Sequence, residues 1–484
     1  MKERVLLQGT VSEVFFPNKG KVIPTVDQPP LPEADFLNEI RYKAPSEPHG
    51  PFYVKNVLPG QTLLASLGSR GKKSREGRLL KLVSPAPYET EPACPHAGPC
   101  GGCRYQTVPY ELQLEWKDAQ VSRLLEAVPE AAQALRRPIA PSPLTLEYRN
   151  KMEFSFGDSC KGGPLTLGLH REGAFHDIIS TPSCRLIHPD MRAILAATED
   201  FFRSADATYY NTHTHEGWLR HLVLRRSFST GEILVNLVTS SQPGTDLAPW
   251  CERLLALPCE GSVCGILHTV NDSLGDVVQK DELTLLFGRD YLTEELLGLT
   301  FRISPFSFFQ TNSAGAGQLY QIVRRMAGDL SHQHVFDLYC GTGTIAQILA
   351  KAGAERVTGI ELVEEAAAAA RRNAEANGLT NCDFLAGDVL KLVDGLSYKP
   401  DLIILDPPRD GCHPKALPKI LAWQPERFIY VSCKPTSLVR DLPFFLEAGY
   451  EIREIQCCDM FPMTPGVETV CLLSKSKSDK PSDV

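Results

Sequence analysis

The chain has 484 residues, of which 43% are hydrophobic and 22% charged, so about three globular domains of roughly 150 residues are expected. No run of roughly 18 apolar residues is available for a membrane helix, and a net charge of −8 disfavours indiscriminate binding to nucleic acid while allowing a local basic surface. The amino terminus lacks the apolar stretch of a secretory signal and the 15 cysteines are too dilute for a disulfide scaffold, so we expect a cytoplasmic protein.

Short β-type runs separated by turns fill the first 85 residues, which predicts a small barrel of the oligonucleotide-binding type. A proline-rich segment, residues 24–51, interrupts them and is interpreted as a long insertion. Residues 91–106 form a loop rich in Cys, Gly and Pro, and an amphipathic helix is expected from about Tyr110 to Glu126. From about residue 140 to residue 300, strand-like stretches predominate and indicate an antiparallel α+β region.

Beyond residue 300, strands alternate with helices, and this order is typical of an open, mainly parallel sheet. The clearest helix is expected from Glu364 to Ala376, because that segment is rich in alanine. The expected strands are Val335–Leu338, Arg356–Ile360, Cys382–Ala386, Leu402–Leu405, Arg427–Val431, Tyr450–Cys457 and Glu468–Ser474. The lysine-containing tail after Ser474 is predicted to be disordered.

The turn after the first of these strands carries two glycines, Gly341 and Gly343, and leads into a helix. Glycine lets the backbone approach a ligand closely, and the helix N-terminus offers free N–H groups. Glu361 ends the next strand, where a nucleoside-binding sheet presents a carboxylate to the ribose hydroxyls, and Asp388 follows the third strand. Each acid alone could simply cap a helix or sit in a turn. Because these signals fall at successive strand ends, we expect a site for S-adenosylmethionine.

The fourth and fifth strands end in groups suited to chemistry. Asp406 is followed by two prolines, which would stiffen the loop and direct the carboxylate into the pocket. Cys433 follows the fifth strand, and a thiolate there could add to C6 of uracil and make C5 able to attack a sulfonium methyl. The C5 proton must then leave, which requires a general base. Glu468, at the start of the last strand, is the candidate for that base.

Three cysteines lie close together in the Cys/Gly/Pro loop, and a fourth candidate ligand lies further along the chain. They are Cys94, Cys100, Cys103 and Cys184. Four thiolates suit either zinc or a [4Fe–4S] cluster. Zinc ribbons usually pair two Cys-x2-Cys knuckles, and the second knuckle is missing here, so the iron–sulfur interpretation is favoured.

Several stretches together resemble the RNA uracil-C5 methyltransferase family, in its iron–sulfur 23S rRNA type. They are Cys94–Gln106, Tyr148–Met152, Cys184 with His188-Pro189, Phe309–Asn312, Asp337–Thr344, Leu405–Arg409, Val431–Lys434 and Val467–Thr469. The resemblance implies that Cys433 is the nucleophile and Glu468 the base. The S-adenosylmethionine contacts that it implies are Gln310, Tyr339, Glu361 and Asp406. It further implies RNA as the partner, with no membrane and no obligate protein partner. The basic run at residues 70–81 would then supply salt-dependent RNA affinity.

The resemblance also implies the fold class and the domains. The fold class is α/β, with a C-terminal Rossmann-like class I methyltransferase sheet, an α+β central domain and an N-terminal small β-barrel of the TRAM type. The expected boundaries are 1–86 for the barrel, 87–108 and 141–298 for the iron–sulfur-bearing central domain, 109–140 and 299–476 for the methyltransferase domain, and 477–484 for a disordered tail.

Two alternatives stay open. A cytosine-C5 RNA methyltransferase would also use a cysteine after the fifth strand. It would want a second cysteine directly after the fourth-strand prolines, where Arg409 stands, and Cys412 lies further along. A non-catalytic iron–sulfur RNA-binding module is the other alternative, and the joint presence of Asp406, Cys433 and Glu468 counts against it.

Overall fold

The computed structural model describes residues 2–26, 28, 40–43, 49–68, 75–275, 281–392 and 398–476. Residues 70–74 of the basic run, most of the expected insertion and the whole tail at 477–484 lie outside the described residues. The chain divides into two compact units. The first comprises residues 1–92, 104–122 and 463–465, and the second comprises residues 93–103, 123–462 and 466–484.

A closed β-barrel forms most of the first unit. Its strands are β1 (Lys2–Phe15), β2 (Lys19–Pro24), β3 (Ile40–Lys43), β4 (Phe52–Lys55), β5 (Thr62–Gly68) and β6 (Glu76–Ser84). Five of them pair in a ring, in the order β1, β2, β4, β6, β5 and back to β1, while β3 pairs with β1 alone. Alternate residues along these strands fill a core that includes Val22, Phe52 and Leu63. The small barrel predicted from the sequence is therefore confirmed.

Helix α1 (Tyr110–Leu125) lies where the amphipathic pattern predicts a helix. Its first part belongs to the first unit, where Trp116 packs edge-on against Tyr88 and Tyr105. From Arg123 onward the chain belongs to the second unit. The assignment of residues 109–140 to the methyltransferase domain stays a prediction.

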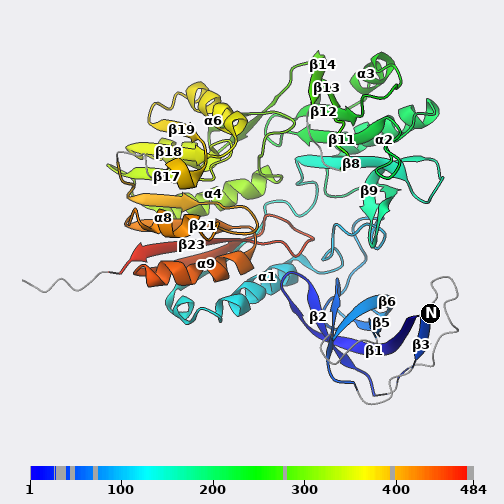
Figure 1. Ribbon diagram of the computed structural model, residues 1–484, viewed down its shortest axis with the longest axis horizontal. Coiled ribbons are helices and arrows are strands. Elements are labelled where there is room, and N and C mark those ends of the chain that lie inside the picture. The colour runs from blue at the N-terminus through cyan, green and yellow to red at the C-terminus, as the bar shows by residue number, and fades with distance from the viewer. Residues whose placement is uncertain are drawn as a thin grey trace, which may run out of the picture. The chain divides into compact units, whose positions relative to one another are not determined.

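A seven-stranded sheet occupies the middle of the chain, in the order β10-β9-β8-β11-β12-β13-β14 (Figure 1). Its elements are β8 (Lys151–Asp158), β9 (Leu165–Arg171), β10 (Ala174–Ser180), α2 (Pro189–Ser204), β11 (Leu219–Arg226), β12 (Glu232–Thr239), α3 (Ala248–Leu255), β13 (Ser262–Val270) and β14 (Glu282–Gly288). Strands β12 and β13 run parallel, because α3 provides the crossover that a parallel pair requires. The expected antiparallel pairing is wrong for this pair.

An open, mainly parallel sheet follows, as the alternation of strands and helices predicts. Its order is β19-β18-β17-β20-β21-β23-β22-β7, in which β23 runs antiparallel to both of its neighbours. Its strands are β17 (His334–Leu338), β18 (Arg356–Glu361), β19 (Cys382–Ala386), β20 (Leu402–Leu405), β21 (Arg427–Ser432), β22 (Tyr450–Cys458) and β23 (Glu468–Lys475). The intervening helices are α5 (Thr344–Lys351), α6 (Glu364–Ala376), α7 (Val389–Leu392), α8 (Ala416–Leu421) and α9 (Pro435–Glu447).

The eighth strand of this sheet comes from far earlier in the chain. Strand β7 (Leu135–Ala140) follows a short 3-10 helix (Pro129–Gln133) and pairs in parallel with β22 at the sheet edge. The backbone N–H of Asp459 donates to the carbonyl oxygen of Ala140 at 2.9 Å, just beyond the ladder. The sequence did not predict β7 as a strand of this sheet.

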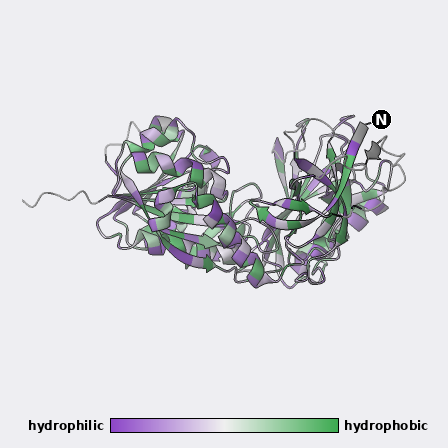
Figure 2. Ribbon diagram, turned by 90° about the horizontal axis from the view of Figure 1, so that it is seen from below, coloured by the Kyte–Doolittle hydropathy of each residue, from purple (hydrophilic) through white to green (hydrophobic). Residues whose placement is uncertain are grey.

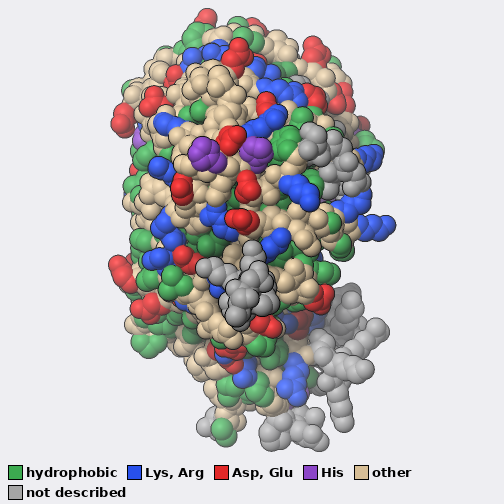
Figure 3. Space-filling model, turned by 90° about the vertical axis from the view of Figure 1, so that its left-hand side faces the viewer, with side chains coloured by type: hydrophobic (Ala, Val, Ile, Leu, Met, Phe, Trp, Pro, Cys, Tyr) green, Lys and Arg blue, Asp and Glu red, His purple; other side chains and the backbone are tan. Residues whose placement is uncertain are grey.

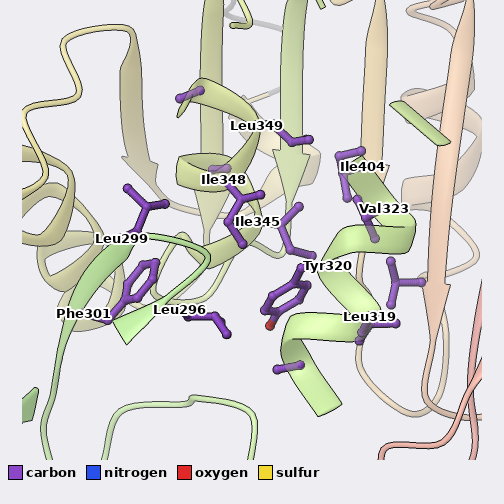
Figure 4. Close-up of a cluster of buried hydrophobic side chains, with 14 of the residues drawn as sticks. Leu296, Leu299, Phe301, Leu319, Tyr320, Val323, Ile345, Ile348, Leu349 and Ile404 are labelled. Carbon is purple, nitrogen blue, oxygen red and sulfur yellow. The ribbon is translucent and has the colours of Figure 1, made fainter. Parts of the chain in front are cut away.

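Helix α4 (Ser313–Ala327) and the hairpin of β15 (Leu292–Leu296) and β16 (Leu299–Ile303) complete the hydrophobic core of this region. Figure 4 shows Leu319 and Val323 of α4 close to Ile345 of α5 and Ile404 of β20. Hydrophobic and hydrophilic residues both occur along the helices, as expected for elements with one buried face (Figure 2). No helix among the described residues is long and apolar enough to cross a membrane.

Candidate active site

The turn between β17 and α5 has an unusual backbone. Tyr339, Gly341 and Gly343 have φ angles of 65°, 54° and 74°, in the left-handed region that favours glycine. A Cβ atom at Gly343 would lie 2.4 Å from the ring of Phe384, so a side chain at this position would also clash. The two glycines therefore shape a sharp turn that brings backbone N–H groups to the N-terminus of α5.

Glu361 is the last residue of β18, and Asp388 lies in the turn that follows β19. The Glu361 carboxylate accepts hydrogen bonds from the backbone N–H groups of Gly341 at 2.9 Å and Val363 at 3.0 Å. Asp388 is half-buried. Burial raises the pKa of Tyr339, and the nearby charge of Asp388 raises it further. The strand-end acids therefore lie around the glycine turn.

One pocket lies beside this turn. Four of the seven predicted cofactor contacts line it, namely Gln310, Tyr339, Gly341 and Asp406. The other three are not part of the lining: Gly343 and Asp388 lie in the adjoining turns, and Glu361 lies at the end of β18. The lining also includes Phe308, Phe309, Tyr320, Asp337, Cys340, Thr342, Thr344 and Ile345. The structure thus gathers the predicted residues in one region, while their role as ligand contacts stays a prediction.

Two buried pocket residues were missed by the sequence reasoning. Asp337 is 1% exposed; its Oδ2 accepts a hydrogen bond from Ala346 N at 2.9 Å, and its Oδ1 has no partner among the described residues. Burial and the charge of Asp406 hold the pKa of Asp337 well above its usual range. Tyr320 of α4 is buried (Figure 4), and its side chain forms a hydrogen bond with that of Gln310. An acid inside the apolar strand β17 was the available signal for Asp337.

Cys433 and Glu468 meet where β21 ends and β23 begins. The antiparallel ladder pairs Ser432 with Thr469, so Cys433 and Glu468 are the next residues of the two strands. Burial of Glu468 raises its pKa, the charge of Asp406 adds to the increase and that of Arg409 opposes it, and together they bring the pKa to about 8.

The thiol of Cys433 is sensitive to the same charges. Burial together with the charges of Glu468 and Asp406, and against that of Arg409, raises the pKa of half-buried Cys433 to about 11. Burial also raises the pKa of Asp406 to about 7. Three acidic groups therefore share a site, and the charge of Arg409 favours the ionised forms of two of them, Cys433 and Glu468.

The loop after Asp406 is anchored to α9. Ser437 Oγ donates a hydrogen bond to the carbonyl oxygen of Arg409 at 2.7 Å. Asp441 accepts hydrogen bonds from Cys412 N at 3.0 Å and from Tyr430 Oη at 2.8 Å. Cys412 itself is 2% exposed, and burial raises its pKa to about 12, so its thiol is enclosed and protonated.

The four predicted metal ligands lie close together in a second region, called here the cysteine neighbourhood. Cys94, Cys100 and Cys103 are half-buried, Cys184 is buried, and none of them forms a disulfide. Burial and the charges of the other three cysteines together raise the pKa of Cys103 to about 12, which indicates that the four sulfurs are close together. Within the described parts of the chain, no group of three or more His, Cys, Asp or Glu side chains has a geometry ready to hold a metal ion.

Comparison with known proteins places this site in a family. A family model described as tRNA (Uracil-5-)-methyltransferase matches residues 276–476. An uncharacterized RNA methyltransferase of Clostridium tetani is 49% identical over 419 residues, which are 86% of this chain and 91% of the relative. An uncharacterized RNA methyltransferase of Clostridium acetobutylicum is 46% identical over 424 residues, which are 87% of this chain and 92% of the relative.

A solved structure agrees with these sequence relatives. The tRNA (uracil-54, C5)-methyltransferase of Pyrococcus abyssi, in complex with S-adenosyl-L-homocysteine, is 26% identical and superposes with a TM-score of 0.72. The match covers 96% of this chain and 100% of the Pyrococcus chain, so it extends over the barrel and both sheets. The α/β fold class predicted from the sequence is confirmed. The chain belongs to the RNA uracil-C5 methyltransferase family.

Proposed function

We propose that this protein transfers the methyl group of S-adenosylmethionine to C5 of a uridine in 23S rRNA. The observation that carries the proposal is the meeting of Cys433, Glu468 and Asp406 beside the pocket formed by the glycine turn. A nucleophile, a base and a cofactor pocket within one region are the parts that this reaction needs.

The pocket suits a cationic nucleoside cofactor. Its glycine turn lets the ligand approach the backbone, and Glu361 lies at the end of the neighbouring strand. The unpartnered Oδ1 of Asp337 and the carboxyl group of Asp406 are acidic groups that a positively charged ligand would stabilise. When bound, S-adenosylmethionine supplies the methyl group as an electrophile.

The protein's own residues carry the other steps of the proposed reaction. The thiolate of Cys433 adds to C6 of uracil, and C5 becomes nucleophilic enough to form a bond to the methyl carbon. The bond between that carbon and the sulfonium sulfur breaks in the same step, and its electrons stay on sulfur, which leaves S-adenosylhomocysteine as a neutral thioether. Glu468 then takes the C5 proton, and the electrons of the broken C5–H bond restore the ring double bond as the Cys433 sulfur leaves C6. The raised pKa of Glu468 suits a proton acceptor working near neutral pH. The target base must leave its stack to reach both residues.

The enclosed position of Cys412 counts against the cytosine-C5 alternative. A second nucleophilic cysteine would have to face the bound base, whereas Cys412 is 2% exposed and its backbone N–H donates to Asp441. Arg409 occupies the position directly after the two prolines. We therefore assign the nucleophile to Cys433 alone.

The cysteine neighbourhood is proposed to hold a [4Fe–4S] cluster with a structural role. The support is the donor set: four thiols that form no disulfide and are close enough for their charges to interact. Three of them lie in one loop, with two small residues between Cys100 and Cys103. A modest movement of these side chains would be needed to ligate the cluster, because the described residues hold no ready-made metal geometry. We propose that the cluster organises the loop and takes no part in methyl transfer.

Transfer RNA is the second candidate substrate, because the matched family model and the Pyrococcus structure both name it. Labelled S-adenosylmethionine should be incubated with unmodified 23S rRNA and tRNA transcripts, and the nucleosides of each product identified. 5-Methyluridine in the 23S transcript supports the proposal. The same nucleoside in tRNA alone would show that tRNA, and not 23S rRNA, is the substrate. 5-Methylcytidine, or no transfer to either transcript, overturns the proposed activity.

A further inference from the structure

A buried arginine in the seven-stranded sheet has no acidic partner. Arg225 is 3% exposed, and within the described part of the chain no carboxylate forms an ion pair with it. Its guanidinium donates hydrogen bonds instead to the carbonyl oxygens of Pro305, at 3.2 Å, and Ser307. Its charge is therefore solvated by neutral groups and remains electrostatically uncompensated.

A second cation lies directly opposite it. Strands β8 and β11 pair Lys151 with Arg225 in register, so both side chains project from the same face of the sheet. Lys151 is half-buried, and its ammonium makes no hydrogen bond or ion pair with the described residues. Burial and the charge of Arg225 lower the pKa of Lys151, and the exposed Glu153 only partly opposes this effect. Like charges facing each other across a ladder are unfavourable unless an anion lies beside them.

This pair of cations is joined to the loop that lines the active-site pocket. Arg225 holds the carbonyl groups of Pro305 and Ser307, and Asn150, the neighbour of Lys151, donates to the carbonyl oxygen of Gln310 at 2.8 Å. Lys151 and Arg225 are not themselves part of the pocket lining. An anion bound at Lys151 would therefore lie beside the loop, outside the space assigned to the cofactor.

We infer that Lys151 and Arg225 form a binding site for an RNA backbone phosphate next to the target nucleotide, with Lys151 as the direct contact. Arg225, buried next to Lys151, adds positive charge to the site. Its hydrogen bonds to Pro305 and Ser307 fix the pocket loop relative to that phosphate. The inference rests on the proposed function, because it assumes that RNA enters between the seven-stranded sheet and the pocket. A phosphate is favoured over the carboxylate of the cofactor because the cations lie outside the pocket lining.

Binding measurements on Lys151→Gln and Lys151→Arg test this site. The probe is whichever unmodified transcript, 23S rRNA or tRNA, the wild-type protein methylates, titrated at several NaCl concentrations with S-adenosylhomocysteine present. Lys151→Gln should weaken RNA binding about 5- to 10-fold at 0.1 M salt and reduce the salt slope by about 0.7, as expected for one lost phosphate contact. Lys151→Arg should restore most of the affinity and the slope.

Lys475→Gln is the matched control. Lys475 is exposed at the end of β23, which is the end of the strand opposite to Glu468, and its ammonium donates to Gln424 O at 2.7 Å. The face on the left of Figure 1, where β23 ends, shows basic side chains mixed with acidic ones (Figure 3). Removing this charge should change RNA affinity less than 2-fold.

The affinity for S-adenosylhomocysteine, measured by calorimetry without RNA, distinguishes an RNA phosphate from the cofactor carboxylate as the anion bound at Lys151. It should stay within about 2-fold of wild type in Lys151→Gln. A loss of this affinity with unchanged RNA binding would overturn the inference and assign the cations to the cofactor carboxylate. Unchanged RNA affinity and salt slope would also overturn it. Absence of methyl transfer by the wild-type protein would instead defeat the proposed function, so the two failures are distinguishable.

Discussion

Cys433 and Glu468 are neighbours across the junction of two antiparallel strands, each being the residue just beyond the Ser432–Thr469 pair. The opposite directions of β21 and β23 bring the residue that follows β21 beside the first residue of β23. The charge of Glu468 raises the pKa of Cys433, so ionising both groups together is unfavourable. This coupling suits a reaction in which the thiolate and the carboxylate act at different steps.

Substituting the two residues should therefore give different defects. Cys433→Ala should lower methyl transfer by at least about 10³-fold, because no thiolate can add to C6. Glu468→Gln should transfer the methyl group but accumulate a covalent protein–RNA adduct, visible on a denaturing gel. Cys412→Ala is the matched thiol control and should retain activity, since Cys412 is enclosed beside Asp441. Full turnover by Cys433→Ala, or an adduct through Cys412, would contradict the assignment.

Arg409 should set the pH dependence of the reaction. Its charge lowers the pKa of both Cys433 and Glu468. The chemistry needs the ionised forms, so kcat/KM should rise between pH 7 and pH 9. Arg409→Gln should move this rise to higher pH by about 0.5 to 1 unit, because both pKa values increase when the charge is lost. Arg409→Lys should leave the profile close to that of wild type, and identical profiles for all three proteins would refute the role of this charge.

The buried carboxyl group of Glu468 should make the fold less stable at alkaline pH. Burial raises its pKa from 4.5 to about 8, so the folded chain keeps a proton that the unfolded chain loses above pH 4.5. The free energy of unfolding should therefore fall as the pH rises from about 4.5 to 8. Glu468→Gln should raise it at pH 8.5 by about 2 to 4 kcal/mol and change it little at pH 4.5.

Urea titrations at the two pH values measure this difference. Glu375→Gln, which alters an exposed carboxylate on α6, is the control and should change stability by less than about 0.5 kcal/mol at either pH. If Glu468→Gln changed the free energy of unfolding equally at both pH values, packing and not the buried charge would account for the effect of the substitution.

An iron–sulfur cluster bound by Cys94, Cys100, Cys103 and Cys184 should give the protein a visible colour. Anaerobic purification should yield a brown protein with a broad absorbance at roughly 400 nm and about four irons per chain. Cys184→Ser should lose the colour and the iron, because it removes the buried member of the set. Cys160→Ser, which alters an exposed thiol in the turn between β8 and β9, should keep both. A colourless protein with stoichiometric zinc would reject the iron–sulfur proposal.

The sequence predicts most of the C-terminal sheet because buried parallel strands are short apolar runs bounded by polar turns. The same turns contain Gly341, Asp406 and Cys433, so the residues at the strand ends could be found without a structure. Asp337 was missed because it lies inside an apolar strand, where an acid is usually unexpected. The pairing of Lys151 with Arg225 was also beyond reach, because it depends on the register of two strands from distant segments.

Strand β7 was missed for a different reason. Its sequence, Leu-Arg-Arg-Pro-Ile-Ala, alternates poorly and contains a proline, which is tolerated because the strand lies at a sheet edge. Its exposure leaves it with little hydrophobic pattern. Its strand conformation is defined by parallel pairing with β22, which the sequence of β7 does not reveal.

This late partner has a consequence for synthesis of the protein. Roughly 300 residues separate β7 from β22, so at roughly 5 to 20 residues per second the ribosome needs roughly 15 to 60 s to deliver the partner strand. The nascent β7 must wait unpaired during that interval. A fragment begun at residue 299 would never receive it, and its β22 would keep an open edge that other chains can join. Two segments far apart in the sequence are therefore needed to cover β22 with the proline-containing edge strand β7.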